Sequence, residues 1–364
     1  MLKGKTVAVV VPAYNEEKQI GMVLETIPDF VDRIVVVDDL SDDKTVGVVI
    51  DHIRNDSKTA IPLNKIKKIE PTRYNRAEMF MKELNVRERA LFVRSKIAST
   101  GREDSRIILI NHSEKGGVGG SIATGYKWCK DNHIDCTAVM AGDGQMDPEE
   151  LETLCLPIVD GEADYVKANR LIHRSALFVI PKLRFFGNSI LSLLTKIASG
   201  YWHISDSQTG YTAISLDSLN AIRLHKIHRG FGCPNDILVK LNIAFCTIKE
   251  VPSKPVYDVG EESKMNELKV ILPITFLLAK SFCERLYKKY LFRNFHPLFL
   301  LYHFAFILLI VDIPFVVRGV NAMSPGSILL LPDLIAFIFL TIVGFQSLFF
   351  AMWMDMMDNE RLQK

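Results

Sequence analysis

Several short polar segments combine carboxylates, amides and glycines in a way that suits a phosphate-bearing ligand. The segment P-A-Y-N-E-E at 12–17 follows an apolar run and carries groups suited to a ribose or a base edge. The same residue types also form ordinary helix N-termini, where acids are favourable. The segment D-D-L-S-D-D at 38–43 follows a second apolar run, and its two leading acids could hold a nucleoside. We interpret Ser41 or Asp42 as a plain helix N-cap.

Two further segments contain glycines and acids. G-G-V-G-G-S at 116–121 is a glycine-rich turn before a helix, which would let the backbone approach a diphosphate. It matches neither the G-x-G-x-x-G fingerprint nor a P-loop. In A-G-D-G-Q-M-D at 141–147, Asp143 and Asp147 could hold a hard divalent cation that bridges phosphates. Asp147 is also a good helix start, and we interpret it as a cap rather than a ligand.

An alternation of apolar runs and helical patterns must position these segments. Strands are predicted at 6–12, 33–39, 107–112, 137–142 and 165–170, and helices at 17–27, 45–54, 119–132 and 149–159. This order predicts an α/β fold with a mostly parallel sheet covered on both faces. Ligands of such sheets bind at the carboxyl ends of the strands, which is where the acidic segments lie.

The composition excludes several classes of protein. The chain has 364 residues with 44 Lys and Arg against 42 Asp and Glu, and a net charge of +2 gives no global basis for binding nucleic acid. Its six cysteines show no C-x-x-C pairing, so neither a zinc site nor a disulfide framework is indicated. The first residues lead into an apolar run without a small-residue cleavage site, unlike a signal peptide.

A long stretch interrupts the alternation at 46–106. Its portion 58–106 holds 13 Lys and Arg against 6 Asp and Glu. One interpretation is a solvated helical excursion without a catalytic part. The other is a basic surface that contacts anionic lipid or another protein.

The last third of the chain is far more apolar than the rest. Residues 266–295 combine an apolar run at 270–279 with five cations at 280–293 and predict amphipathic helices at a membrane surface. Two apolar segments within 296–353 are each long enough to cross a hydrocarbon core of about 30 Å. Cations gather before the first segment, so the positive-inside bias predicts that 1–265 and the tail 354–364 are cytoplasmic.

Two acids lie inside these predicted spans, Asp312 and Asp333. Charged residues at such positions are costly and usually face protein or water. They either hold subunits or the hairpin together, or lie near helix ends beside Pro314 and Pro332 and reach the interface.

The order of the motifs resembles the family 2 glycosyltransferases, in particular the membrane-anchored branch of dolichyl-phosphate mannose and glucose synthases and undecaprenyl-phosphate sugar transferases. The resemblance covers 5–265, and the hairpin is similar to the anchors of that branch. Further matches follow in order: N-R at 169–170, D-S-Q-T-G-Y at 206–211, G-C-P-N-D at 232–236 and E-S-K at 262–264. The resemblance implies a GT-A fold, a nucleotide-diphosphate sugar donor, Mg²⁺ or Mn²⁺, and inversion at the anomeric carbon.

The resemblance also implies roles for individual residues. Asp143 would be the metal-binding acid of the D-x-D motif. Ala141 stands where that motif has its first acid, so a strict dependence on metal is not implied. In the segment at 38–43, Leu40 replaces the glycine that follows the double Asp in the family. Donor-binding residues would be Pro12, Tyr14, Glu16, Asp39, Gly116 and Gly119.

A departing diphosphate gathers negative charge that basic side chains stabilise. We expect Arg170 and Lys264 to contact phosphate, with Gln208 on the acceptor side. A polyprenyl phosphate is already ionised, whereas a sugar hydroxyl needs a general base. Asp236 aligns with that base in relatives that act on hydroxyls, and Asp206 is a second candidate.

These residues support one main hypothesis and two alternatives. The main hypothesis is transfer of a single hexose from a GDP-mannose or UDP-glucose type donor to a polyprenyl phosphate at the cytoplasmic membrane face. The acceptor could instead be a hydroxyl of a lipid-linked glycan or glycolipid. A non-catalytic nucleotide-sugar-binding membrane protein is the third hypothesis. The two-helix anchor favours a homo-oligomer.

Overall fold

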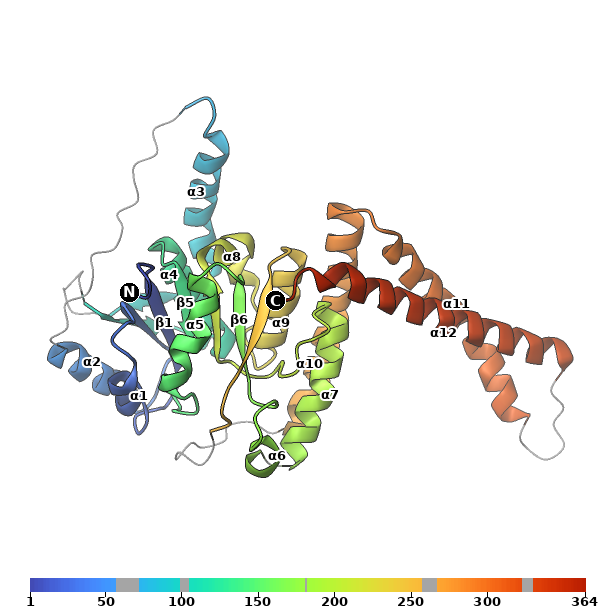
Figure 1. Ribbon diagram of the computed structural model, residues 1–364, viewed down its shortest axis with the longest axis horizontal. Helices are drawn as coiled ribbons and strands as arrows, with labels where there is room; N and C mark the ends of the chain where they lie inside the picture. The colour runs from blue at the N-terminus through green and yellow to red at the C-terminus, as the bar shows by residue number, and fades with distance from the viewer. Residues whose placement is uncertain (57–71, 99–104, 181, 257–266, 323–329) are drawn as a thin grey trace.

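The computed structural model describes residues 1–56, 72–98, 105–180, 182–256, 267–322 and 330–364 (Figure 1). Within these residues the centre is an eight-stranded sheet in the order β3-β4-β2-β1-β5-β7-β6-β8. The strands are β1 Val7–Ala13, β2 Arg33–Asp38, β3 Ser95–Ile97, β4 Ile107–His112, β5 Cys136–Val139, β6 Tyr165–Asn169, β7 Thr212–Ser215 and β8 Ile248–Pro252. The five strands predicted from the apolar runs are all present, which confirms the α/β fold.

Helices cover both faces of the sheet, because alternate side chains of each strand enter different cores. Val7, Val9 and Val11 pack with α1, α2 and α5, whereas Ala8 and Val10 pack with α4, α8 and α9. The helices of the sheet region are α1 Ile20–Thr26, α2 Thr45–Asn55, α3 Arg76–Glu88, α4 Val118–Asp131, α5 Leu151–Val159, α6 Ala176–Val179, α7 Lys182–Ser199, α8 Leu216–Ala221 and α9 Cys233–Ile243. Single turns of 3₁₀ helix are η1 Arg89–Leu91, η2 Pro148–Glu150 and η3 Leu224–Lys226.

The second half of the sheet is mixed, whereas the sequence predicted a mostly parallel sheet. Strands β4, β2, β1 and β5 run parallel, but β7 lies antiparallel between β5 and β6. Strand β8 then pairs in parallel with β6. The strand predicted at 165–170 is therefore not a direct neighbour of the one predicted at 137–142.

The predicted insertion at 46–106 contains α2 and then α3, which projects from the sheet (Figure 1). No residue of α3 is buried. Residues 57–71 and 99–104 of the insertion lie outside the described residues.

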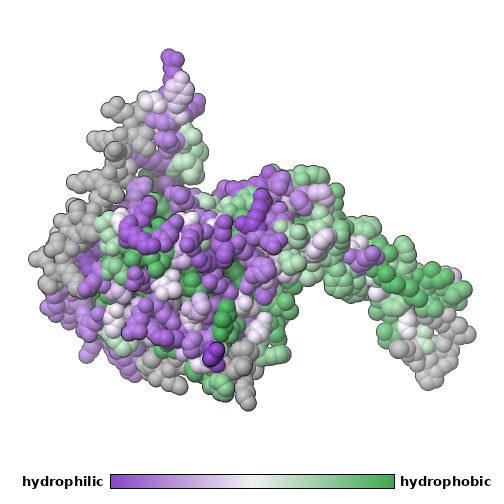
Figure 2. All heavy atoms as spheres, viewed as in Figure 1, coloured by the Kyte–Doolittle hydropathy of each residue, from purple (hydrophilic) through white to green (hydrophobic). Residues whose placement is uncertain are grey.

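The C-terminal third forms three long helices, α10 Glu267–Tyr287, α11 Pro297–Asn321 and α12 Leu331–Glu360, with a π-helical turn η4 Lys288–Arg293 after α10. Helices α11 and α12 pair as a hairpin and are candidate membrane spans by length and composition, each with a mean hydropathy of 2.3. Only 17% and 11% of their most apolar windows are buried, unlike the core helices of a soluble domain. Figure 2 shows hydrophobic surface gathered over this arm and polar surface over the sheet region.

Both acids predicted inside the spans make contacts within the hairpin. Thr341 donates a hydrogen bond of 2.6 Å from its hydroxyl to Asp312. Arg318 pairs with Asp333 at 2.7 Å near the loop end of the hairpin. Asp312 therefore links the two helices, and association of subunits stays a prediction.

A buried ion pair joins the hairpin to the sheet region. Both terminal nitrogens of Arg285 on α10 lie 2.7 Å from the carboxylate oxygens of Asp355 on α12. Arg285 also donates to the carbonyls of Ile197 and Ala198 at the end of α7. One guanidinium thus connects three helices, and its two-point geometry fixes their relative orientation.

The end of the chain pairs with the edge of the sheet. The Ile248 amide donates to the Leu362 carbonyl at 2.8 Å, and the Lys364 amide donates to the Ile248 carbonyl at 3.0 Å. The amide of His203 donates to the Gln363 side chain at 3.2 Å. The predicted tail at 354–364 is thus shorter than expected, because α12 continues to residue 360. The tail therefore lies at the end of the hairpin that adjoins the sheet region.

Candidate active site

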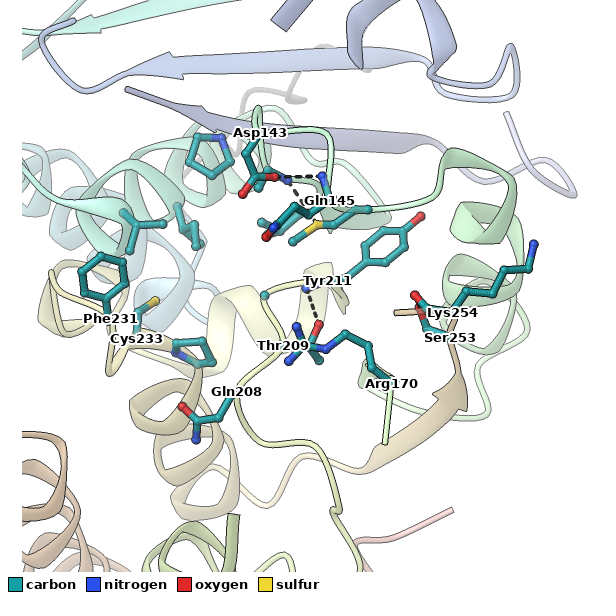
Figure 3. A pocket seen from close by; sticks show the side chains of 18 residues that line it. Asp143, Gln145, Arg170, Gln208, Thr209, Tyr211, Phe231, Cys233, Ser253 and Lys254 are labelled. Carbon is teal, nitrogen blue, oxygen red and sulfur yellow. Dashed lines mark hydrogen bonds between the residues drawn. The ribbon is translucent and has the colours of Figure 1, made fainter. Parts of the chain in front are cut away.

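A cavity of about 260 Å³ opens at the carboxyl ends of the central strands (Figure 3). Four of the sequence-predicted site residues line it: Pro12, Asp143, Arg170 and Gln208. In Figure 3, Asp143 and Gln145 lie on one wall, with Arg170 and Gln208 opposite and Lys254 to one side. Asp143, Arg170 and Lys254 follow strands, as expected for a sheet of this kind, whereas Gln208 lies in the loop before β7.

Asp143 is the acid that faces the cavity. Its Oδ1 accepts a hydrogen bond of 3.0 Å from the Gln145 amide, which orients the carboxylate. Ala141, where the related motif has an acid, also lines the cavity. Asp147 does not line it and accepts a bond of 2.9 Å from the Glu149 amide, which confirms its role as a helix cap.

The residues around Asp143 fit a divalent cation only in company with a ligand. Among the described residues no group of three His, Cys, Asp or Glu side chains gathers as a metal site. Magnesium is often held by one or two carboxylates together with substrate phosphates and water. Asp143 would therefore share a cation with a diphosphate rather than hold it alone.

Arg170 and Asp206 form an ion pair beside the cavity. The Nε atom of Arg170 lies 2.8 Å from Oδ2 of Asp206 and its Nη2 lies 3.2 Å from Oδ1, while the Arg170 amide also donates to Oδ2. Burial raises the pKa of Asp206, but the Arg170 charge and its hydrogen bonds outweigh this and hold the pKa below its ordinary value. Asp206 is fully buried. It is therefore unsuited to the predicted role of base and acts as the anchor of Arg170.

Asp236, the other predicted base, also faces protein. The His228 amide donates a bond of 2.7 Å to its Oδ2, and Lys240 pairs with its Oδ1. Its neighbours Cys233 and Pro234 line the cavity, but Asp236 does not. Helix α9 turns its carboxylate away from the cavity, so the structure gives no support to proton removal by Asp236.

The backbone of the glycine-rich loop binds Asp39. The amides of Gly116 and Gly117 donate to its two carboxylate oxygens at 2.7 and 2.8 Å, and His112 Nδ1 lies 2.8 Å from Oδ1. Burial raises the pKa of Asp39, but the bonds from His112 and the two amides outweigh it, so the pKa is lowered. Neither Asp39 nor Gly116 lines the cavity, and their expected donor contacts stay a prediction.

Gly119 is required for close packing. Its amide donates 2.9 Å to the Arg229 carbonyl, and a Cβ there would lie 1.9 Å from the His228 carbonyl oxygen. The 228–229 loop thus binds the Gly119 amide, and the expected diphosphate contact of Gly119 stays a prediction.

The predicted nucleoside segments bind one another at the ends of β1 and β2. The Asn15 amide donates 3.0 Å to the Ser41 hydroxyl, and the Asn15 side chain accepts from the Asp42 amide at 2.8 Å. The Glu16 amide donates 2.8 Å to the Thr45 hydroxyl. The predicted N-cap role of Ser41 or Asp42 is wrong, because both are tied to Asn15 and α2 starts at Thr45.

Tyr14 lies in the first of these loops. Lys115 donates 2.6 Å to the Tyr14 hydroxyl, and its Nζ also lies 4.4 Å from the ring centroid. Tyr14 and Glu16 do not line the cavity, so a donor role for them stays a prediction.

Lys254 is a cavity residue that the sequence reasoning missed. It follows β8, and its Nζ lies 3.3 Å from Asp147, while its amide donates 2.9 Å to Glu150. The signal available was a cation directly after a strand, but β8 itself was not predicted. Lys264, the cation that was expected to contact phosphate, lies outside the described residues.

Two characterised relatives share part of the chain. It is 25% identical over 254 residues to the UDP-N-acetylglucosamine–dolichyl-phosphate N-acetylglucosaminyltransferase of Methanococcus voltae, covering 70% of this chain and 86% of the relative. It is 29% identical over 165 residues to the undecaprenyl-phosphate mannosyltransferase of Micrococcus luteus, covering 45% of this chain and 67% of the relative. Among solved structures, glucosyl-3-phosphoglycerate synthase from Mycobacterium tuberculosis, in complex with Mn²⁺ and UDP, superposes with a TM-score of 0.46 at 17% identity, covering 78% of this chain and 80% of that chain.

A sequence profile of one family covers more than half of the chain. The profile described as "Glycosyl transferase family 2" matches residues 8–67 and 89–223. The unmatched gap between these parts contains all of α3, the helix that projects from the sheet. The matched parts contain the central strands, Asp143 and the Arg170–Asp206 pair. The chain therefore belongs to glycosyl transferase family 2, and it is a glycosyltransferase of the GT-A fold.

Proposed function

We propose that the protein transfers one sugar from a nucleotide-diphosphate sugar to a polyprenyl phosphate, with inversion at the anomeric carbon. The observation that carries this proposal is a cavity lined by one carboxylate, Asp143, and by two cations, Arg170 and Lys254. The names of both characterised relatives specify a polyprenyl phosphate acceptor but different sugars. The acceptor class is thus better supported than the donor, for which GDP-mannose, UDP-glucose and UDP-N-acetylglucosamine are the candidates.

The two cations suit the charges of such a reaction. Negative charge develops on the departing diphosphate, and the acceptor phosphate brings charge of its own. A divalent cation bound at Asp143, Mg²⁺ or Mn²⁺, would neutralise the diphosphate. Arg170 offers a planar guanidinium and Lys254 a mobile point charge to the phosphate groups.

The protein partners of the two predicted bases favour a phosphate acceptor. A sugar hydroxyl must lose a proton during attack, whereas a phosphate oxygen is already ionised. Asp206 is bound by Arg170, and Asp236 is bound by His228 and Lys240 outside the cavity. A reaction without a general base agrees with this arrangement better than attack by a hydroxyl.

Two apolar helix faces connect the cavity region with the hairpin. Exposed apolar side chains follow one stripe of α7 and one of α10: Phe186, Ile190, Leu193, Leu272 and Phe276. The two helices pack together through a small apolar core. The hydroxyls of Ser192 on α7 and Ser207 in the cavity-side loop are 3.1 Å apart. We propose that both helices lie at the membrane surface, so that the head group of a lipid reaches Arg170.

The orientation follows from charge and from the tail. Exposed Lys280, Lys288 and Arg293 lie just before the hairpin, and cations favour the cytoplasmic face. The tail pairs with β8, so we place it on the same side of the membrane as the cavity in this proposal. We propose an integral membrane protein with its catalytic region and tail in the cytoplasm, associated as a homo-oligomer.

Transfer of label tests the proposal directly. Purified full-length protein in detergent is mixed with Mg²⁺ or Mn²⁺, undecaprenyl or dolichyl phosphate, and one radiolabelled GDP- or UDP-sugar at a time. The expected result is label in the organic phase with one donor, lost in Asp143→Asn. Donor binding without any labelled lipid would reject a phosphate acceptor, and the next acceptor tested would be a lipid-linked glycan. Absence of donor binding would reject catalysis.

A further inference from the structure

A polar cluster lies behind Arg170, on the side away from the cavity. Its centre is Glu250 on β8, whose Oε1 accepts hydrogen bonds from the amides of Ser205 at 2.9 Å and Asp206 at 3.2 Å. The other oxygen, Oε2, accepts a bond of 2.7 Å from the side-chain amide of Asn169. A single carboxylate thus binds two separate loops, one after β6 and one before β7.

Asn169 extends the cluster into the backbone beyond Arg170. Its Oδ1 accepts bonds from the amides of Leu171 at 3.0 Å and Ile172 at 3.2 Å. Asn169 is fully buried at the end of β6. Its amide group is therefore oriented: the oxygen is used by the turn and the nitrogen points to Glu250.

These contacts hold Arg170 from both sides. Asn169 precedes it in the chain, and Asp206 is its ion-pair partner. Glu250 binds the side chain of Asn169 and the backbone amide of Asp206. Neither Glu250 nor Asn169 lines the cavity, so any influence on a ligand there must pass through the lining residues that they help to hold, Arg170 and the loop that carries Gln208.

We propose that Glu250 and Asn169 are positioning residues, which together hold the Arg170 guanidinium in the direction of the acceptor phosphate. This inference rests on the proposed function for the identity of the ligand, but the geometry of the cluster stands independently of it. Loss of the contact between Glu250 and Asn169 would leave the ion pair intact and loosen the backbone on which both partners lie.

The donor and acceptor pattern of the cluster allows a reciprocal test. In Glu250→Gln, an NH₂ group must face either the Asn169 NH₂, which loses one bond, or the two loop amides, which loses two. Asn169 cannot turn over without losing Leu171 and Ile172. In Asn169→Asp alone, two carboxylates face each other. In the double variant Glu250→Gln with Asn169→Asp, the glutamine donates to the new carboxylate. The contact between the two side chains is thus restored with its direction reversed, and the backbone amides still donate to both of them.

Steady-state kinetics with polyprenyl phosphate and the donor found in the transfer assay measure the effect. We expect Glu250→Gln to raise the KM for the lipid phosphate about tenfold, from loss of one charge-assisted bond, with the donor KM unchanged. The double variant should return to within about twofold of the wild type. Glu162→Gln, which alters an exposed partner of Lys249 next to the same sheet edge, is the matched control and should change nothing.

Hydrogen exchange supplies a readout that needs no substrate. The amides at 169–172 and 203–209 should exchange faster in Glu250→Gln and return to wild-type rates in the double variant. Equal increases in donor and acceptor KM, or a double variant no better than the single ones, would overturn the inference. If the wild type labels no lipid phosphate, the proposed function fails, while the exchange rates still decide whether Glu250 positions these loops.

Discussion

The carboxylate of Asp206 is fully buried, whereas 23% of the Arg170 side chain that it binds remains exposed at the cavity. The ion pair thus has an inner and an outer partner. An inner carboxylate fixes the orientation of the guanidinium, and the outer guanidinium meets the ligand. This division explains why two residues that both resemble catalytic groups in the sequence have different roles.

Replacing Arg170 with lysine tests the outer role. Arg170→Lys keeps the positive charge that Asp206 needs but loses the planar fork, so the fold should persist. We expect kcat/KM for the lipid phosphate to fall about 10- to 100-fold, as measured by labelled product in the organic phase. Arg174→Lys, an exposed arginine four residues further on, is the control. Unchanged kcat/KM in Arg170→Lys would show that the guanidinium geometry does not matter.

Ala141 provides a test of the metal. In Ala141→Asp a second carboxylate would face the cavity two residues before Asp143, and added ligand charge raises cation affinity. Calorimetry of Mn²⁺ binding in the presence of UDP or GDP should show affinity about tenfold higher in Ala141→Asp. Asp143→Asn should abolish nucleotide-dependent Mn²⁺ binding. Retention of that binding in Asp143→Asn would place the cation elsewhere.

The role of Lys254 can be separated from that of Lys249, which lies on the preceding strand β8. Lys254→Met removes a cation that lines the cavity, whereas Lys249→Met removes one that pairs with Glu162 away from it. We expect about a tenfold loss of kcat/KM in Lys254→Met and none in Lys249→Met. Equal effects of the two substitutions would mean that Lys254 acts only through the general charge of the surface.

The sequence predicted the part of the site that depends on long strands. The strands β1, β2 and β4 are six or seven residues long and each contains at least four consecutive apolar residues, so their ends and the acids after them could be located. Asp143 was found after β5, which is short but continues into the apolar run 138–141. Strand β7 has only four residues and β8 alternates weakly, so neither stands out, and Lys254 was missed with β8.

Partners distant in the sequence account for the remaining differences. The glycines at 116–119 look open to a phosphate until the 228–229 loop packs against them, more than a hundred residues away. Asp236 looks like a base until α9 turns it toward His228. Such pairings depend on tertiary packing, which local patterns in the sequence do not encode.

Asp39 should make stability depend on pH. Its pKa is lowered in the folded protein, so its contribution is fully present above the ordinary value of 3.8 and is lost as the pH falls through the folded pKa. Asp39→Asn places an NH₂ group against a loop amide and should cost about 2 kcal/mol at neutral pH. Thermal unfolding in detergent should show a difference between wild type and variant that is constant from pH 7 to pH 5 and narrows below about pH 4. A difference that grows on acidification would contradict this sign.

The C-terminal tail should stabilise the sheet edge even though it follows a membrane helix. Leu362 is buried in the core beneath α4, α8 and α9, and its carbonyl accepts from Ile248 at 2.8 Å. Leu362→Ala should therefore cost about 2 to 4 kcal/mol, seen as a lower unfolding temperature of the full-length protein in detergent. Lys364→Ala changes an exposed side chain at the same edge and keeps its backbone bond, so it should have no effect. Because β8 carries Glu250, Leu362→Ala should also speed hydrogen exchange at 203–209. Wild-type unfolding and exchange in Leu362→Ala would show that the tail is dispensable for the sheet.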